Sequence, residues 1–221
     1  MWKEIVAFFR SQGPLQEAYD EAILMLGASH DMFNDAVKQL HAEGVLEYDI
    51  HKRDRQLNKY ERSVRRKIVT HMAVSSKPDI NLGLVLTTIV IDVERIGDYT
   101  KNIVELAGAV PGPFDGLELH GEVAEIEKIM SRMFDDIVPA LEGPDEARAR
   151  SIIGSHEIVA PKVDGHLRTL CAGEVLSGRS GHAATVAIYL RYLKRVSAHL
   201  KNVATSVVNP YYRIGFREKG G

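Results

Sequence analysis

The chain has 221 residues, of which 45% are hydrophobic and 26% are charged, values that are typical of a soluble globular protein. With Lys+Arg 28 against Asp+Glu 30, the formal net charge of -2 excludes the basic excess that general nucleic-acid binding requires. The single cysteine, Cys171, excludes an internal disulfide framework, and we expect its small side chain to be buried. The longest apolar stretch, Leu82–Ile91, is too short to cross a bilayer. We therefore expect a cytoplasmic protein that is peripheral to a membrane at most.

The first half of the sequence predicts three long helices. Apolar residues recur at spacings of three, four or seven over Leu15–His41, as an amphipathic helix requires, and Gly44 follows this pattern. A second helical pattern covers Leu46–Ser75. It is followed by Pro78, which interrupts a helix because proline lacks the amide proton and restricts the residue before it. A third pattern covers Ile80–Ala107.

Glycine and proline residues between positions 108 and 120 mark a break in the chain. After this break the helical periodicity resumes in three further stretches, at residues 121–142, 145–171 and 182–209. We therefore divide the chain into a first three-helix bundle with a short N-terminal extension, a linker, and a second three-helix bundle, which cover residues 1–110, 111–120 and 121–221.

The second half of the sequence repeats the first. Residues 32–37, Met-Phe-Asn-Asp-Ala-Val, resemble residues 133–138, Met-Phe-Asp-Asp-Ile-Val. Residues 92–103 resemble residues 192–203 in their apolar positions and in an Arg, a Lys and an Asn that recur at the same offsets. No alternation of apolar and polar residues is long enough to predict a sheet. The sequence therefore predicts an all-α fold of two tandem three-helix bundles with internal duplication.

Oxygen-bearing side chains share one stripe of the second predicted helix and one of the third. Within each stripe the residues are three or four positions apart, which places them on one helical face. The candidate metal ligands are Asp54, Asn58, Glu61, Glu94, Asp98 and Asn102. Facing each other across antiparallel helices, the two stripes would offer oxygen ligands to a hard divalent cation or to iron. The alternative interpretation is a set of ordinary surface carboxylates that neighbouring Arg and Lys residues balance.

Patterns typical of enzymes are absent from the sequence. No Glu-x-x-His pair suits a di-iron enzyme, and no phosphate-binding or dinucleotide-binding glycine loop is present. We therefore expect no catalytic residues. The apolar N-terminal segment Trp2–Phe9 has two interpretations, a helix that packs back onto the bundle or an amphipathic element that faces a membrane or a partner.

Two of these stretches resemble the PhoU family. Residues 92–105, which include Glu-Arg-Ile-Gly-Asp and Asn-Ile, are similar to the E-R-I-G-D-H-x-x-N-I-x-E signature of that family. Residues 54–61 are similar to its D-x-x-[IV]-N-x-x-E element. The resemblance extends over nearly the whole chain and implies two three-helix bundles. It also implies a non-enzymatic, homodimeric regulator of phosphate uptake and phosphate-starvation signalling, whose partners are a phosphate ABC transporter and a sensor histidine kinase.

Two further roles remain as alternatives. PhoU-like domains also accompany sodium–phosphate cotransporters, and a metal-binding helical bundle would use the acidic stripes. Some members of the family bind metal clusters through such motifs on each bundle. In this chain the second repeat departs from the pattern, because Lys194 replaces Glu94, Ala198 replaces Asp98 and Ala160 replaces Asp54. We therefore expect metal only in the first bundle and none in the second.

Overall fold

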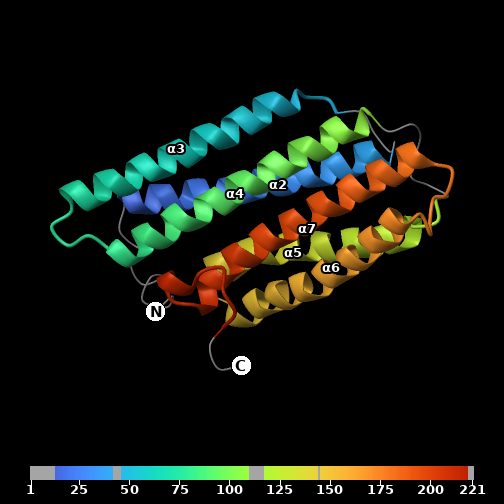
Figure 1. The fold of residues 1–221 in the computed structure, drawn as a ribbon. Helices are drawn as coiled ribbons and strands as arrows, with labels where there is room; N and C mark the ends of the chain where they lie inside the picture. Colours follow the sequence, from blue (N-terminus) through green and yellow to red (C-terminus); the bar gives the residue numbers. More distant parts are fainter. Residues whose placement is uncertain (1–12, 42–45, 110–116, 144, 219–221) are drawn as a thin grey trace.

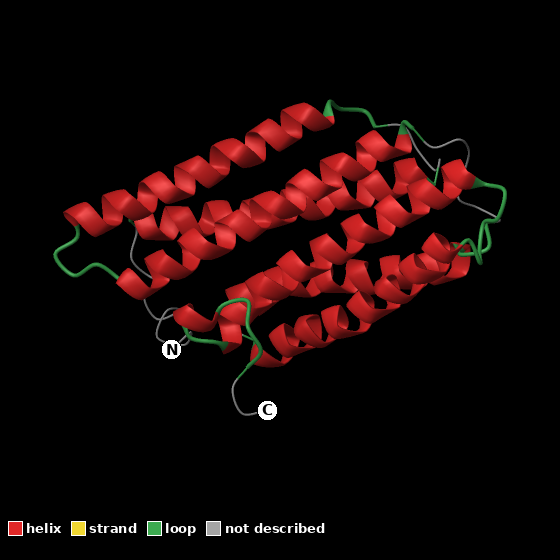
Figure 2. Cartoon of the chain, viewed as in Figure 1, coloured by secondary structure: helices red, strands yellow, loops and turns green. Residues whose placement is uncertain are grey.

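The computed structural model describes residues 13–41, 46–109, 117–143 and 145–218. Within these residues the chain forms six long helices and one short 3-10 helix, and no strand. Figure 2 shows this all-helical architecture. In chain order the elements are α2 (Pro14–Leu40), α3 (Ile50–Val74), α4 (Ile80–Ala107), α5 (His120–Glu142), α6 (Glu146–Ala172), α7 (Ser180–Val208) and η1 (Tyr211–Arg213).

Capping residues fix where several of these helices begin. The side chain of Asp49 accepts hydrogen bonds from the backbone amides of His51 and Lys52, so α3 begins at Ile50 rather than at the predicted Leu46. Asp79 caps α4 by accepting from the amide of Leu82, and Asp145 caps α6 by accepting from the amides of Ala147 and Arg148. These amides lack a partner within the helix.

The six long helices pack as two groups of three. Helices α2, α3 and α4 contact one another, as do α5, α6 and α7. The groups join mainly through α4 and α7, with a smaller contact between α2 and α5, and Figure 1 shows α4 and α7 running side by side between the two groups. The expected all-α fold of tandem three-helix bundles is confirmed.

The predicted division of the chain at residues 111–120 stays a prediction. Residues 110–116 lie outside the described part, and α5 begins at His120, inside the segment that we expected to be a linker. Leu117 and Leu119 are buried against the core. The end of this segment therefore packs against the bundles.

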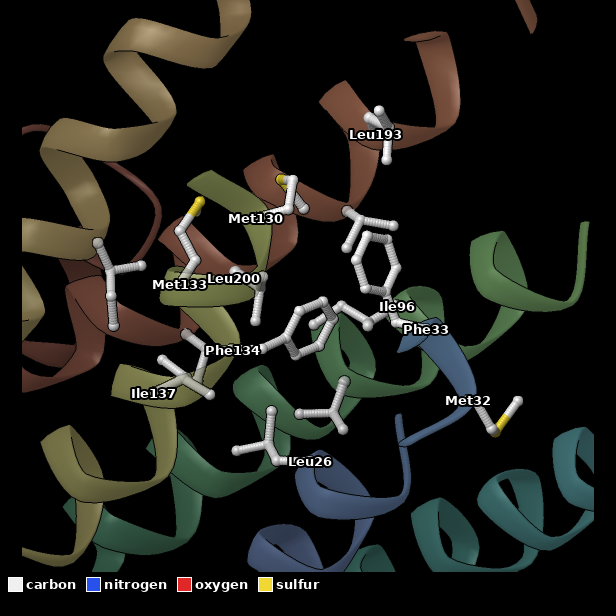
Figure 3. Packing of buried hydrophobic residues seen from close by; sticks show 14 of the residues in the cluster. Leu26, Met32, Phe33, Ile96, Met130, Met133, Phe134, Ile137, Leu193 and Leu200 are labelled. Carbon is white, nitrogen blue, oxygen red and sulfur yellow. The ribbon is translucent and has the colours of Figure 1, made fainter. Parts of the chain in front are cut away.

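One continuous apolar core joins the two groups of helices. Figure 3 shows side chains from α2, α4, α5 and α7 meeting there, with Phe33 and Phe134 close to each other. The centroids of these two rings lie 4.9 Å apart. Phe33 and Phe134 occupy equivalent positions of the two repeats, so the duplicated segments pack against each other.

The expectations for Cys171, for the N-terminal segment and for membrane-spanning helices have different outcomes. Cys171 is exposed, so the expectation that it is buried is wrong: it lies on the outer face of α6, near the end of that helix. The segment Trp2–Phe9 lies outside the described residues. Among the helices that the structure describes, none combines the length and the apolar character needed to cross a membrane.

Candidate functional site

The predicted metal ligands lie along the contact between α3 and α4. Asp54 and Glu61 extend from α3, and Glu94 and Asp98 extend from α4; we call these four residues the acidic cluster. The ammonium of Lys101 lies 3.2 Å from Asp98 Oδ1 and 3.6 Å from Asp54 Oδ1, and so links the two helices. The predicted convergence of the two stripes is therefore present, with a lysine between them.

Burial and mutual repulsion raise the pKa values of two carboxyl groups in the cluster. For Glu94 the main cause is burial, followed by the charge of Asp98, with smaller contributions from Glu61 and Asp54 that Arg95 partly offsets. For Asp54 burial again comes first, and the charge of Asp98 adds to it while that of Lys101 opposes it. Burial therefore disfavours the charged forms of both carboxyl groups, and the neighbouring charge of Asp98 adds to this effect.

Arginine side chains neutralise much of the remaining charge. Arg95 donates a hydrogen bond of 2.9 Å from Nη1 to Asp98, and its Nε lies 3.5 Å from Glu94 Oε2. Arg65 Nη2 lies 2.6 Å from Glu61 Oε1, one helical turn away on α3. These ion pairs agree with the alternative interpretation, in which the carboxylates are ordinary surface residues that neighbouring Arg and Lys side chains neutralise.

The two asparagines of the predicted set have different positions. Asn58 donates from Nδ2 to the backbone carbonyl of Asp54 at 3.0 Å, so its amide group bonds to its own helix. Asn102 lies one turn beyond Asp98 on α4 and is partly buried. All six predicted residues thus line α3 and α4, but the carboxylates alone form the cluster.

The fit of a metal ion to this cluster depends on Lys101. Carboxylate oxygens are the ligand type that hard cations prefer. In the described part of the chain, however, no three His, Cys, Asp or Glu side chains are grouped so that they could hold a metal ion. The ammonium of Lys101 stands where two carboxylates approach each other, and a cation would have to displace it. Metal binding at the cluster remains a prediction.

The corresponding part of the second bundle has different chemistry. Lys194, at the position equivalent to Glu94, donates to both carboxylate oxygens of Asp164 at 2.6 and 2.7 Å. This hydrogen bond and the positive charge lower the pKa of the Asp164 carboxyl. The ion pair between Lys194 and Asp164 therefore links α6 and α7 where several carboxylates and basic residues link α3 and α4.

A polar contact between the bundles could not be predicted from the sequence. Asp92 of α4 accepts hydrogen bonds on Oδ1 from Asn202 Nδ2 at 3.0 Å and lies 2.7 Å from His199 Nδ1, both on α7. The ring of His199 also stacks against Tyr99, with centroids 5.7 Å apart. The sequence feature related to this contact is the internal repeat, since His199 and Tyr99 occupy equivalent positions of the two copies. No pattern indicated that these positions meet.

The fold and the acidic cluster place the chain among all-helical proteins built from two three-helix bundles. Residues 22–107, which form most of the first bundle, match the family described as "PhoU domain". This match contains the whole acidic cluster. The resemblance to the PhoU family is thereby confirmed.

Two similar proteins carry the same family name. The chain is 26% identical over 198 residues to a "Phosphate-specific transport system accessory protein PhoU homolog" from Pseudomonas putida, covering 88% of this chain and 77% of that protein. A homologue with the same description from Pseudomonas aeruginosa is 25% identical over 198 residues, covering 88% and 82%.

Two solved structures share the fold. The crystal structure of PhoU from Pseudomonas aeruginosa gives a TM-score of 0.75 at 23% identity, covering 88% of this chain and 95% of that one. The phosphate transport system regulatory protein PhoU from Streptococcus pneumoniae gives a TM-score of 0.74 at 14% identity, covering 88% and 93%. At these identities the likeness concerns the arrangement of helices.

Proposed function

We propose that this chain is an accessory protein that regulates a phosphate transport system. The observation that carries the proposal is the PhoU domain match over residues 22–107, together with relatives that are described as phosphate-specific transport accessory proteins. The described helices offer long polar faces for partners. The acidic cluster at the α3–α4 contact gives one of these faces a distinct charge.

The finer proposal is a cytoplasmic, homodimeric adaptor that acts through a phosphate ABC transporter and a sensor histidine kinase. A strain that lacks the gene tests it. We expect phosphate uptake to lose its restraint, and starvation genes to be expressed although phosphate is abundant. Normal uptake together with normal repression would overturn the proposal. Uptake that changes only in its sodium-dependent part would favour the alternative partner, a sodium–phosphate cotransporter.

Complementation of that strain tests whether the acidic cluster carries the activity. The double variant Glu94→Gln/Asp98→Asn keeps the shape of the side chains and removes two charges. We expect it to restore regulation poorly, while Glu125→Gln, which removes an exposed carboxylate of the second bundle, restores it fully. Equal complementation by the two variants would show that the cluster is not required.

Metal binding is a second candidate function, and it is favoured by the raised pKa values of Asp54 and Glu94. A cation would relieve the repulsion between the carboxylates, but it competes with Lys101. We expect Lys101→Met to increase the metal content of purified protein, and Glu94→Gln/Asp98→Asn to abolish it. Elemental analysis measures both. Metal content that is negligible in the wild type and in Lys101→Met, or that survives the double variant, would exclude this site.

A further inference from the structure

The segment that follows α7 folds back along the second bundle and borders an open pocket. Asn209 donates from Nδ2 to the backbone carbonyls of Arg213 and Phe216, at 3.1 and 2.7 Å, and so fixes the turn around η1. The backbone amide of Gly215 donates to Thr205 Oγ1 of α7 at 2.7 Å. Residues 209–218 thus form an ordered cover, which Figure 1 shows beside the end of α7.

Between this cover and helices α6 and α7 lies a pocket of about 410 Å³, which we call the C-terminal pocket. Its basic lining residues come from three elements: His156 from α6, Lys201 from α7 and Arg217 from the cover. Among the described lining residues, Glu157 supplies the carboxylate, and its Oε1 lies 3.2 Å from Arg217 Nη2. The pocket therefore has an excess of positive charge.

The repeat explains why Lys201 differs from its counterpart. Lys101, its equivalent in the first bundle, lies between the carboxylates of Asp98 and Asp54. The positions equivalent to those two carboxylates hold alanine in the second bundle, at Ala198 and Ala160. Lys201 instead donates from Nζ to the backbone carbonyl of Gly215 at 2.6 Å. The second bundle therefore retains the lysine but has alanine in place of its two acidic partners.

The environment of Lys201 and His156 disfavours their charged forms. Burial lowers the pKa of Lys201, although the charges of Asp92 and Glu157 partly oppose it. Burial also lowers the pKa of His156, and the charges of Lys201 and Lys194 on α7 add to this effect while Glu157 on α6 opposes it. An anion in the pocket would reverse both effects, because it stabilises the positive forms.

The hydrogen bonds of His156 leave one ring nitrogen for such a ligand. Its Nδ1 lies 2.9 Å from Ser197 Oγ, and the hydroxyl of Ser197 donates to the backbone carbonyl of Lys194 at 2.9 Å. Ser197 therefore accepts from Nδ1–H of His156. In the neutral ring Nε2 then carries a lone pair, and it becomes a donor only when His156 takes up a proton.

From these contacts we propose that the C-terminal pocket binds a small tetrahedral oxyanion of the phosphate type. Lys201 and Arg217 donate hydrogen bonds to its oxygens, and Arg217 exchanges Glu157 for the anion. His156 takes up a proton on binding and donates from Nε2. This site stands on the contacts of α6, α7 and the C-terminal cover, and it does not depend on the proposed role in transport.

Isothermal titration of the full chain with sodium phosphate and with sodium sulfate tests the site, with sodium chloride as the reference salt. Both oxyanions should bind saturably at one site. Sulfate keeps its charge between pH 8 and pH 6, so a tighter binding of sulfate at pH 6 reports the proton taken up by the protein. Absence of saturable binding by both anions, or sulfate binding that does not change with pH, would overturn the proposal.

Variants locate the binding within the pocket. Lys201→Met and Arg217→Ala should each weaken sulfate binding by roughly tenfold, the usual effect of losing one charged hydrogen bond. Glu157→Gln should strengthen it, because Arg217 is released from its carboxylate. Lys162→Met removes an equal charge from α6 outside the pocket and should leave affinity unchanged. Arg217 is 89% exposed, so Arg217→Ala will fold even if Lys201→Met does not. Unchanged affinity in Arg217→Ala and Glu157→Gln would refute the site.

Discussion

The ring of Phe33 lies against the ring of Phe134 with 4.9 Å between their centroids, and the two residues hold equivalent positions in the two repeats. Tyr99 and His199, another equivalent pair, stack with their centroids 5.7 Å apart. When two copies of a repeat are related by a twofold axis, equivalent residues can contact each other only close to that axis. The two pairs, one between α2 and α5 and one between α4 and α7, therefore mark a pseudo-twofold axis through the contact of the bundles.

Loss of the phenylalanine contact should destabilise both bundles together. Phe134 is buried, and Phe134→Ala is expected to lower the free energy of unfolding by about 3–5 kcal/mol, the usual cost of removing a large aromatic side chain from a core. Chemical denaturation followed by circular dichroism measures it. Tyr212 is 75% exposed, so Tyr212→Ala should change stability by less than about 0.5 kcal/mol. Similar effects of the two variants would contradict the buried contact.

The bond between Asp92 and His199 offers a second test of the contact between the bundles. Asp92→Ala leaves the partners of its carboxylate on α7 without an acceptor, and we expect a loss of about 1–3 kcal/mol in the free energy of unfolding. His199→Ala alone should cost a similar amount. If the two residues act as a pair, the double variant costs less than the sum of the single ones. Additive costs in denaturant unfolding would show that they do not interact.

The helices and their order were predictable because they follow from local periodicity. The predicted Ile80–Ala107 is the observed α4, and α5 and α6 continue through Pro139 and Pro161, as the apolar pattern indicated. The start of α3 was placed four residues too early, because the cap that Asp49 supplies carries more weight than apolar spacing in fixing a helix terminus.

The carboxylates of the acidic cluster and their neutralisation by neighbouring Arg and Lys residues were predictable, but the place of Lys101 between the two helices was not. Helical spacing places Glu94 and Asp98 on one stripe, yet the position of Lys101 between Asp98 and Asp54 depends on how closely α3 and α4 approach. The bond between Asp92 and His199 depends on the packing of two bundles about 100 residues apart in sequence. Local patterns carry no information on such contacts.

Gly97 sets the close approach of α3 and α4. A Cβ atom at this position would overlap Cδ1 of Leu57, which is buried on α3. We expect Gly97→Ala to lower the free energy of unfolding by about 1–3 kcal/mol, the usual cost of overpacking a core. A Cβ atom at Gly154, within α6, would meet no neighbouring side chain, so Gly154→Ala should stabilise by about 0.5–1 kcal/mol. Thermal unfolding compares them, and a stabilised Gly97→Ala would show that Leu57 moves aside freely.

The raised pKa of Glu94 makes its charge unfavourable to folding at neutral pH. In the folded protein the carboxyl group of Glu94 keeps its proton to a higher pH than in the unfolded chain, where it titrates near the ordinary value of 4.5. As pH rises from about 4.5 through the folded pKa, stability is lost, and none of it returns at higher pH. Glu94→Gln should therefore raise the melting temperature at pH 7 but not at pH 4. A lower melting temperature at pH 7 would mean that the ion pair with Arg95 outweighs the cost of burying the charge of Glu94 and its repulsion by Asp98.

His156 should produce the opposite dependence on pH. Its pKa in the folded protein is below the ordinary value of 6.5, chiefly because it is buried and also because Lys201 and Lys194 are near. As pH falls below about 6.5, the unfolded chain binds this proton before the folded chain does, so the free energy of unfolding decreases until the folded pKa is reached. Above pH 6.5 the residue contributes no slope.

His156→Gln should reduce this loss of stability below pH 6.5. Above pH 7 the free energy of unfolding should depend on pH in the same way in the variant and in the wild type. Denaturant unfolding at a series of pH values measures the difference, and subtracting the two curves removes the contribution of the other histidines. Sulfate, which stabilises the protonated ring in the proposed pocket, should flatten the wild-type curve in the same range. Parallel curves for the two proteins below pH 6.5 would show that His156 is not held in its neutral form by the fold.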